Sequence, residues 1–465
     1  MPKLNGECLL LLKEKTHKMG CGLKSFGYAT MHYLERNLWL VLMLVVLVLG
    51  LALRYSLVPY VSSDLINYVF PWMKTLSEPS QGLGGNGFLY IVNDSFTPDQ
   101  EPFYMMILGI LAQLPAGPSI TSYAGGDPFP LYYAYYVKSV SFVFDIFIAL
   151  GAFAIFDRLT KDKMQSAMVF CVVFLLPVVV VNSAMWGQID SYYTCFLVWS
   201  IYFLVSGHPI WSVVFLGLGI SAKPQGIFFL PFFLYLWLER KMKFRWLLLA
   251  PLVILLTYSP YWFMGGSFTK PFEWVFLGFG EYGGLNYGAG NIWAFFHYYT
   301  NDNTANMTNT LMSTMSVLVG LTVLIAMVLI IHGRHLVLDS KALIGVAAVF
   351  ALATPFFLSK MHERYFYLFD VFVVIYAFAL KRRYWLIVLK EFSSIIGYSS
   401  FMFSRDLFSF MSYDDNIIVS AMINAFILVV VLYDLRSLPY KSKAEREKDL
   451  AYLADKAEEY KNGRK

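Results

Sequence analysis

The chain has 465 residues, of which 58% are hydrophobic and only 14% are charged. Soluble domains carry about 25% charged residues, so this composition excludes an ordinary soluble protein and indicates an integral membrane protein. The net charge of +5 at pH 7 does not indicate nucleic-acid binding, because the basic residues separate apolar runs and form no patch on a soluble domain.

Residues 1–37 read as a cytoplasmic tail. They lack the order of a signal peptide, and the first long apolar run, from about Leu38, is followed by no small-residue cleavage site, so we expect that run to remain as a helix. The four cysteines form no CxxC or Cys/His pattern, which predicts neither a disulfide framework nor a metal site.

Hydrophobic run length predicts an all-α polytopic protein with about twelve transmembrane helices. A spanning helix needs about 20 mostly apolar residues. On that criterion the expected spans are 38–55, 132–157, 165–184, 190–206, 210–222, 226–238, 246–263, 309–331, 342–358, 365–380, 384–403 and 416–435. The spans at 210–222 and 226–238 are short, and an alternative is one re-entrant hairpin with Lys223 and Gln225 at its tip.

The lysines and arginines predict the orientation. With the N-terminus inside, 27 of the 36 lie in the two tails and in the turns of one face. Cytoplasmic loops carry an excess of Lys and Arg, so this face, with both termini, is predicted to be cytoplasmic.

Two long segments then lie outside, at about 55–131 and 265–308. The first is expected to contain interfacial amphipathic helices at 62–78 and 101–115; the second of these is too short to cross the membrane and is expected to dip into it. Residues 436–465 are expected to form a charged helical tail on the cytoplasmic side.

Ionisable side chains are costly inside a membrane, so those on the external side or within spans indicate a site. They come from distant segments, and those outside the spans share one membrane level, the outer leaflet boundary. They are Asp64, Lys74, Glu101, Lys138, Asp145, Asp190, Lys223, Glu281, the group 360–364 and Arg405.

Cations and a carboxylate at that depth fit chemistry on a lipid headgroup. Arg and Lys bind phosphate, and a nearby carboxylate can accept a proton from a hydroxyl group. A phosphate leaving group needs electrostatic neutralisation and no general acid, so one carboxylate base suffices for an inverting glycosyl transfer from a polyprenyl-phosphate sugar to an alcohol.

Six ordered motifs resemble bacterial GT-C glycosyltransferases, in particular a subgroup related to the mannosyltransferases of GPI-anchor synthesis. They are "SSDLINYVFPW", "EPFYMMILG", "NSAMWGQIDS", "GISAKPQGIFFLP", "GLNYGAGNIWAFF" and "FLSKMHERYFYLFD", and the similarity covers about residues 55–370. The resemblance implies a GT-C-like fold, a polyprenyl-phosphate-linked sugar donor, an active site on the extracytoplasmic face of the plasma membrane, and a catalytic acid in the first external loop. The histidines show no metal-ligand spacing, so no metal is expected, and no other cofactor is expected either.

Carried over by motif, the resemblance makes Asp64 the catalytic acid residue. The donor phosphate is expected to bind Arg364, His362, Lys223, Lys360 and Gln225. Further candidates for substrate contact are Glu101, Trp186, Gln188, Asp190, Glu281, Asn286 and Asn291. The family's "NPPY" or "DYPP" stands here as "QEPF", which leaves a second acidic role open between Glu101 and Asp99.

On this basis the chain divides into four parts. They are the tail 1–37, a catalytic transmembrane module 38–263 that includes the loop 55–131, a module 264–435 with the donor-phosphate site, and the charged tail 436–465.

Each candidate also has a structural interpretation. Asp64 could cap a helix, although Ser62 or Ser63 could do so instead, and Asp190 could cap the next helix. Trp186 could belong to an interfacial aromatic belt, and the 360–364 group could anchor the chain by snorkelling. Lys138 and Asp145 lie two helical turns apart on one face and are expected to form a buried structural pairing, either with one another or each with another helix; the alternative is a proton path. The glycine-rich segment 281–291 is either a mobile flap over the sugar or an ordinary loop.

Two other functions compete with glycosyl transfer. A transporter or flippase of lipid-linked sugars should carry ionisable residues through the midplane and show internal repeats. A polysaccharide polymerase or ligase would also use external basic residues, but typically without an early acidic loop residue. The sugar and the acceptor, which include glycan and glycolipid classes, are left open by the sequence.

Overall fold

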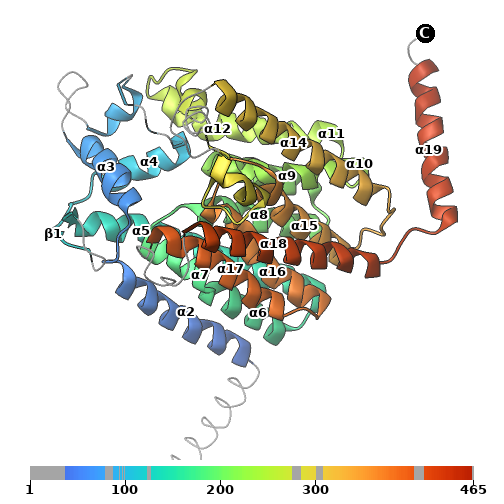
Figure 1. Ribbon diagram of the computed structural model, residues 1–465, viewed down its shortest axis with the longest axis horizontal. Helices are drawn as coiled ribbons and strands as arrows, with labels where there is room; N and C mark the ends of the chain where they lie inside the picture. The colour runs from blue at the N-terminus through green and yellow to red at the C-terminus, as the bar shows by residue number, and fades with distance from the viewer. Residues whose placement is uncertain are drawn as a thin grey trace, which may run out of the picture.

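The computed structural model describes residues 37–78, 87–93, 95–96, 98, 100–122, 127–274, 284–299, 307–402 and 413–462, and it is mostly helical (Figure 1). The α-helices are α2 (Leu38–Leu57), α3 (Phe70–Ser77), α4 (Pro102–Leu111), α5 (Leu131–Thr160), α6 (Lys163–Leu175), α7 (Pro177–Val180), α8 (Asp190–Val205), α9 (Pro209–Ala222), α10 (Leu230–Leu238), α11 (Phe244–Leu247), α12 (Leu249–Phe263), α14 (Met307–His332), α15 (Ser340–Phe357), α16 (Tyr367–Leu380), α17 (Trp385–Met402), α18 (Tyr413–Asp434) and α19 (Lys443–Asn462).

Short helical turns and four two-residue strands join these helices. The turns are η1 (Leu65–Val69), η2 (Gly87–Val92), η3 (Val181–Trp186), η4 (Pro224–Phe229), η5 (Ile292–Tyr299), η6 (Glu363–Phe366) and η8 (Leu435–Ser437). The strands β1 (Ser119–Ile120) and β2 (Phe129–Pro130) are antiparallel, and β3 (Asn286–Tyr287) pairs with β4 (Met361–His362) in parallel.

In the described part of the chain, six helical segments are long and apolar enough to cross a membrane, and α6 with α7–η3, bent by 49°, makes a seventh if the pair counts as one span. This confirms an all-α, multi-pass membrane protein. The helices α8, α9, η4–α10 and α16 occupy four of the other five predicted spans but are shorter, and α17 occupies the fifth without being apolar enough, so the count of twelve stays a prediction.

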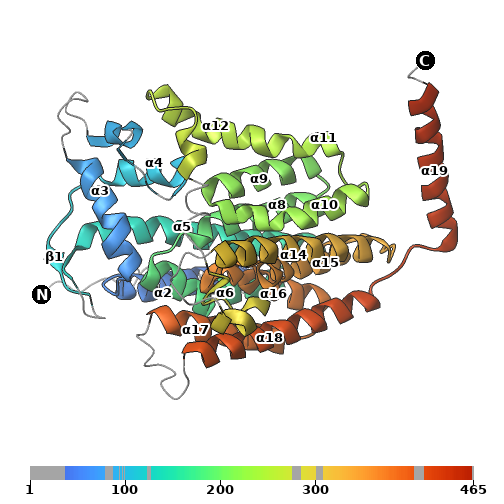
Figure 2. The same cartoon turned by 45° about the horizontal axis from the view of Figure 1, so that its top comes forward.

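The long helices run side by side, so each turn lies at one of two ends of the bundle (Figure 2). One end, here called the site end, carries α3, α4 and β1. The other, the basic end, carries the turns 158–163, 240–245, 334–341 and 381–383. There Glu239 accepts from Lys441 at 3.1 Å and lies 2.8 Å from His332, and Arg383 donates to Asp434.

Two apolar clusters fill the bundle. The larger combines residues of α5, α6 and α8 with residues of α15, α16 and α18, so one core extends across the predicted boundary at residue 264. The smaller lies at the site end and joins η1, α3 and α4 to the start of α5. At the site end, η1, α3 and α4 therefore form a packed layer that covers the end of the bundle.

The expectation for Lys138 and Asp145 is confirmed. The Lys138 ammonium group has four backbone oxygens within hydrogen-bond distance, among them those of Tyr60 at 2.6 Å and Ala184 at 2.7 Å. Asp145 pairs with the fully buried Arg54 of α2 at 3.0 Å. Both side chains hold other segments against α5.

The interfacial helices differ in detail from their prediction. Helix α4 has ten residues, about 15 Å of length, which is half of the hydrocarbon thickness and fits a segment that does not cross. In the segment 62–78, Leu65, Val69 and Met73 are buried as the packed face, but Tyr68 is exposed. The predicted single helix at 62–78 is a π-helical turn, η1, followed by the α-helix α3.

Candidate functional site

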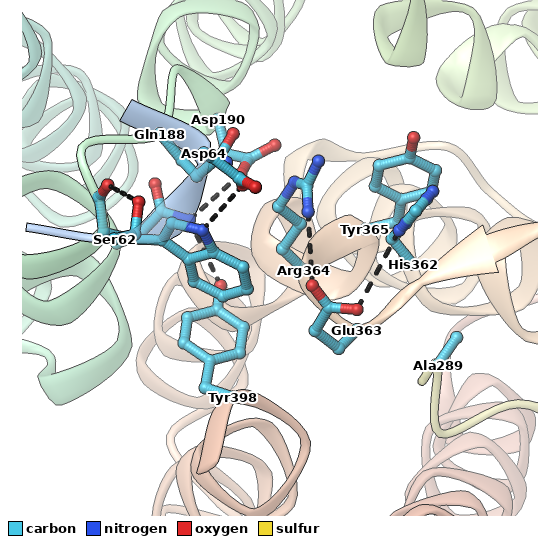
Figure 3. Close-up of polar contacts among 12 residues, drawn as sticks. Ser62, Asp64, Gln188, Asp190, Ala289, His362, Glu363, Arg364, Tyr365 and Tyr398 are labelled. Carbon is cyan, nitrogen blue, oxygen red and sulfur yellow. Dashed lines mark hydrogen bonds and ion pairs between the residues drawn. The ribbon is translucent and has the colours of Figure 1, made fainter. Parts of the chain in front are cut away.

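The site is organised around Asp64, at the first turn of the segment that follows α2. Its carboxylate Oδ2 accepts hydrogen bonds from Trp186 Nε1 at 3.0 Å and from Gln188 Nε2 at 2.6 Å (Figure 3). Within the described chain, the other oxygen, Oδ1, makes no hydrogen bond. Asp64 is half-buried, so one oxygen is held while the other is available to a substrate.

The capping interpretations are wrong. The Asp64 side chain makes no capping hydrogen bond, and Ser62 Oγ donates to the Trp186 carbonyl oxygen at 2.8 Å. Asp190 likewise caps no helix. Trp186 is fully buried, which excludes a place in an interfacial belt.

Arg364 contacts the same tryptophan. Its Cζ is 5.4 Å from the centroid of the Trp186 ring, and its Nη1 donates to Glu363 Oε1 at 3.2 Å. In Figure 3 the Asp64 carboxylate and the Arg364 guanidinium group lie next to one another, each from a different part of the bundle. One indole thus contacts the predicted acid and the predicted phosphate ligand.

The backbone around Trp186 explains this position. Gly187, which follows the π-helical turn η3, has φ of +76°, where a glycine is favoured, and a Cβ on it would lie 2.4 Å from Leu65 Cδ1. The close approach lets η3 pack against the turn that carries Asp64. Isolated π-helical turns occur often at functional sites, and two of them, η1 and η3, meet here.

A buried polar pair lies beside this centre. Lys223, at the end of α9, donates to Asp190 at 2.5 Å, and Asn182 donates to the same carboxylate at 3.0 Å. Burial lowers the pKa of Lys223, and Asp190 opposes this. Lys223 therefore has a carboxylate partner, Asp190, as Arg364 has Glu363, and a phosphate contact from Lys223 stays a prediction.

Gln225 and His362 form a third group, joined by Tyr365. Gln225 Nε2 donates to Tyr365 Oη at 2.9 Å, and the rings of Tyr365 and His362 are 5.2 Å apart. His362 also stacks on Tyr287 at 5.3 Å. Burial, with the charges of Arg364 and Lys223, lowers the pKa of His362 well below its usual value, so a neutral imidazole is present at pH 7 and can donate one hydrogen bond.

Glu363 is the counter-ion of Arg364. Burial raises the pKa of its carboxyl group to about 6, although the charge of Arg364 acts in the opposite direction. Lys360 has a left-handed backbone, with φ of +61°, and its N–H donates to the Leu285 oxygen at 2.8 Å. Its ammonium group has no ion pair among the described residues.

The remaining candidates occupy different places. Glu101 is buried in front of α4 and is close enough to oppose the effect of burial on the pKa of Lys223. Asn286 donates to Asn291 at 2.7 Å, and Asn291 donates to the Leu358 oxygen at 3.0 Å. These two buried amides tie their loop to the end of α15, and a substrate contact from either stays a prediction.

The loop holding these asparagines also fixes His362. Strand β3 pairs Tyr287 with His362 and Asn286 with Met361. The part of this glycine-rich segment that the structure describes, from residue 284 on, is therefore anchored, which favours the ordinary-loop interpretation there. Glu281, Asp99 and Arg405 lie outside the described residues.

Sequence reasoning missed the residues that position the charged groups. Gly187 and Tyr365 stand inside the quoted motifs but received no role, and Ser62 was considered only as a helix cap. Tyr398 of α17, whose ring meets Trp186 at 5.0 Å, stands outside the motifs. For Ser62, Gly187 and Tyr365, the only signal in the sequence was that each stands close to a charged residue of the same motif.

In the described part of the chain, no group of three or more His, Cys, Asp or Glu side chains is placed to hold a metal ion. No protein-family model matches the chain, and a search of curated proteins finds no match. The GT-C resemblance therefore depends on the six motifs alone.

Proposed function

We propose that the protein is a membrane glycosyltransferase that moves a sugar from a polyprenyl-phosphate donor to a hydroxyl group of a glycan or glycolipid acceptor, with inversion. The observation that carries the proposal is that Trp186 contacts both Asp64, at 3.0 Å, and Arg364, at 5.4 Å. A base and a cation that contact the same indole suit a substrate with a hydroxyl nucleophile on one side and a phosphate leaving group on the other.

The reaction divides between these groups. Asp64 Oδ1 accepts the acceptor's hydroxyl proton while the acceptor oxygen forms a bond to the anomeric carbon from the face opposite the phosphate. The bond from the anomeric carbon to the phosphate oxygen breaks, and the electron pair leaves with the polyprenyl phosphate. Arg364 neutralises the growing charge of that phosphate, and His362 donates a hydrogen bond to it.

The arrangement of the bundle supports the same proposal. The predicted acid, the WGQID segment, Lys223 and the HERY segment all lie at the site end, opposite the basic turns. The positive-inside rule puts the basic end in the cytoplasm and the site on the extracytoplasmic face. A fold of the GT-C type with about twelve spans belongs to this proposal.

The buried charges of the transmembrane helices argue against a transporter. Arg54 pairs with Asp145 at 3.0 Å and Lys390 with Asp370 at 2.9 Å, all with side chains at most 1% exposed. Fixed pairs in a packed core do not form an ion or substrate pathway. A transporter would also leave the donor intact, whereas a transferase consumes it.

The test is sugar transfer by the purified protein in liposomes that contain a panel of polyprenyl-phosphate hexoses and candidate acceptors. Asp64→Asn keeps the shape and can accept from Trp186 and Gln188 through its amide oxygen, but it cannot accept a proton. We expect transfer to fall by about 100- to 10,000-fold, the usual contribution of a general base.

Glu78→Gln is the matched control, since Glu78 is an exposed acid of the same segment whose pair with Lys74 contributes little. We expect it to retain full activity. Undiminished transfer by Asp64→Asn, or donor movement across the bilayer without release of polyprenyl phosphate, would overturn the proposal.

A further inference from the structure

A cavity of about 350 Å³ opens between α14 and α18 near the basic end, far from Asp64. Its walls are apolar for most of their length. They include Met327 and Ile330 of α14 and Val429 and Leu432 of α18, and the cavity ends at Arg334 and Arg436. It is thus a hydrophobic groove with two arginine side chains at one end.

Those two arginines differ from their neighbours. Within the described chain, neither guanidinium group pairs with a carboxylate, and Arg436 Cζ lies only over the Tyr433 ring, at 5.7 Å. Arg382 and Arg383, at the same end of the bundle, both bind Asp434. Among the described residues, no carboxylate therefore neutralises the positive charge at the groove.

The backbone holds the two arginines in place. Val337 N–H donates to the Pro439 oxygen at 2.8 Å, and Lys441 N–H donates to the His335 oxygen at 2.8 Å. These bonds tie the segment after α14 to the segment after α18. The backbone segments that carry the two arginines are therefore held next to one another.

The apolar walls also face outward. Ile330 is 62% exposed and Val429 is 64% exposed, at the depth of a membrane-crossing helix. A free phosphate ion would use the arginines but not the walls, whereas a phospholipid uses both: an acyl chain along the groove and a headgroup phosphate at its end.

We infer that this groove binds one anionic phospholipid of the basic-end leaflet, with its phosphate between Arg334 and Arg436. The inference is independent of the proposed reaction, because the groove shares no residue with the site around Asp64. A lipid there joins α14 to α18 in a place where side chains leave the space between the two helices unfilled.

Native mass spectrometry of the full-length detergent-solubilised protein tests this with phosphatidylglycerol and phosphatidylcholine of identical acyl chains. We expect the wild type to retain one phosphatidylglycerol in preference to phosphatidylcholine. Arg334→Ala with Arg436→Ala should weaken that retention at least tenfold, and the pair Arg334→Lys with Arg436→Lys should restore most of it. Ile330→Trp, which fills the groove and leaves the charges, should weaken it as well.

Arg245→Ala with Lys341→Ala is the matched control, since it removes two exposed basic-end charges outside the groove and should leave retention unchanged. Equal retention of the two lipids by the wild type, or full retention by the double alanine variant, would overturn the inference. So would displacement of the lipid by glycerol 3-phosphate alone, which would show a site for a soluble anion. A wild-type dimer that Ile330→Trp dissociates without changing lipid retention would assign the groove to a second copy and would equally overturn the inference.

Discussion

The Trp186 indole has two functions at the scale of single residues. Its N–H orients the Asp64 carboxylate, and its ring lies next to the Arg364 guanidinium group. Tyr398 and Phe401 hold the ring on its other sides, at 5.0 Å and 4.9 Å. A buried aromatic side chain with one polar atom can therefore set the distance between two charged groups without being charged itself.

Substitutions of Arg364 and of its counter-ion Glu363 distinguish the contribution of Arg364 to stability from its contribution to activity. Arg364→Ala leaves Glu363 buried without a partner, so we expect a lower melting temperature in detergent and a loss of sugar transfer. Adding Glu363→Gln should restore most of the melting temperature but none of the activity. Arg364→Lys keeps the charge without the planar fork and should retain an intermediate activity.

Recovery of transfer in the double variant would contradict a phosphate-binding role, because it would show that Arg364 acts only by neutralising Glu363. The measurements are thermal unfolding and the KM for the polyprenyl-phosphate sugar, taken on the same preparations.

Donor affinity should depend on pH through Glu363. Its raised pKa of about 6 means that the carboxyl group is neutral below pH 6, so Arg364 is then uncompensated, and is charged above pH 6, where it offsets Arg364. His362, with its lowered pKa, stays neutral across most of this range. We expect the dissociation constant of the donor, whose phosphodiester stays anionic, to rise severalfold from pH 5 to pH 7.5.

Equilibrium binding to Asp64→Asn, which turns the donor over slowly, measures this constant. With Glu363→Gln added to Asp64→Asn, the dissociation constant of the donor should no longer change over the same pH range. An unchanged pH dependence in that variant would assign the titration to another group.

At the scale of secondary-structure elements, the buried Asp145 carboxylate connects four elements: α5, α2, η3 and α16. Asp145 of α5 accepts from Arg54 of α2 at 3.0 Å, from Ser183 of η3 at 2.7 Å and from Tyr367 of α16 at 3.4 Å. Because η3 ends at Trp186, this network also supports the site. The sequence predicted a buried role for Asp145, but its partners lie on helices whose neighbours no local pattern identifies.

Arg54→Met should destabilise the bundle strongly, since it leaves a buried carboxylate unpaired, which typically costs about 3–5 kcal/mol. The second substitution Asp145→Asn should recover part of this loss. Lys163→Ala, which breaks the partly exposed pair with Asp157, is the control and should change the free energy of unfolding by about 1 kcal/mol or less. Equal effects of Arg54→Met and Lys163→Ala on thermal unfolding would contradict the role of the buried network.

At the scale of the whole molecule, the two ends of the bundle differ in kind. The site end has interfacial helices, two short strand pairs and the polar centre, and the basic end has short turns and the projecting helix α19 (Figure 2). This asymmetry is what a catalyst acting at one membrane surface requires. It also makes the orientation in the membrane directly testable.

Single cysteines at the two ends should label from opposite sides of the membrane. In a background in which the four native cysteines are replaced by serine, Ser119→Cys at the site end should react with a membrane-impermeant maleimide in intact cells. Arg245→Cys, exposed at the basic end, should react only after permeabilisation. The reverse pattern would place the site in the cytoplasm and contradict the proposed topology.

The sequence by itself determined the all-α membrane class, the approximate position of almost every described helix and the gathering of basic turns at one end. Hydrophobic run length and charge are local properties, so they need no knowledge of packing. Only the tertiary structure decided which helices are neighbours, and hence that Asp64 meets Trp186 and Gln188, that Lys223 is engaged by Asp190, and that Arg364 remains beside the acid. Those contacts join segments distant in the chain, and they depend on close approaches such as Gly187 against Leu65, which no periodicity in the sequence reveals.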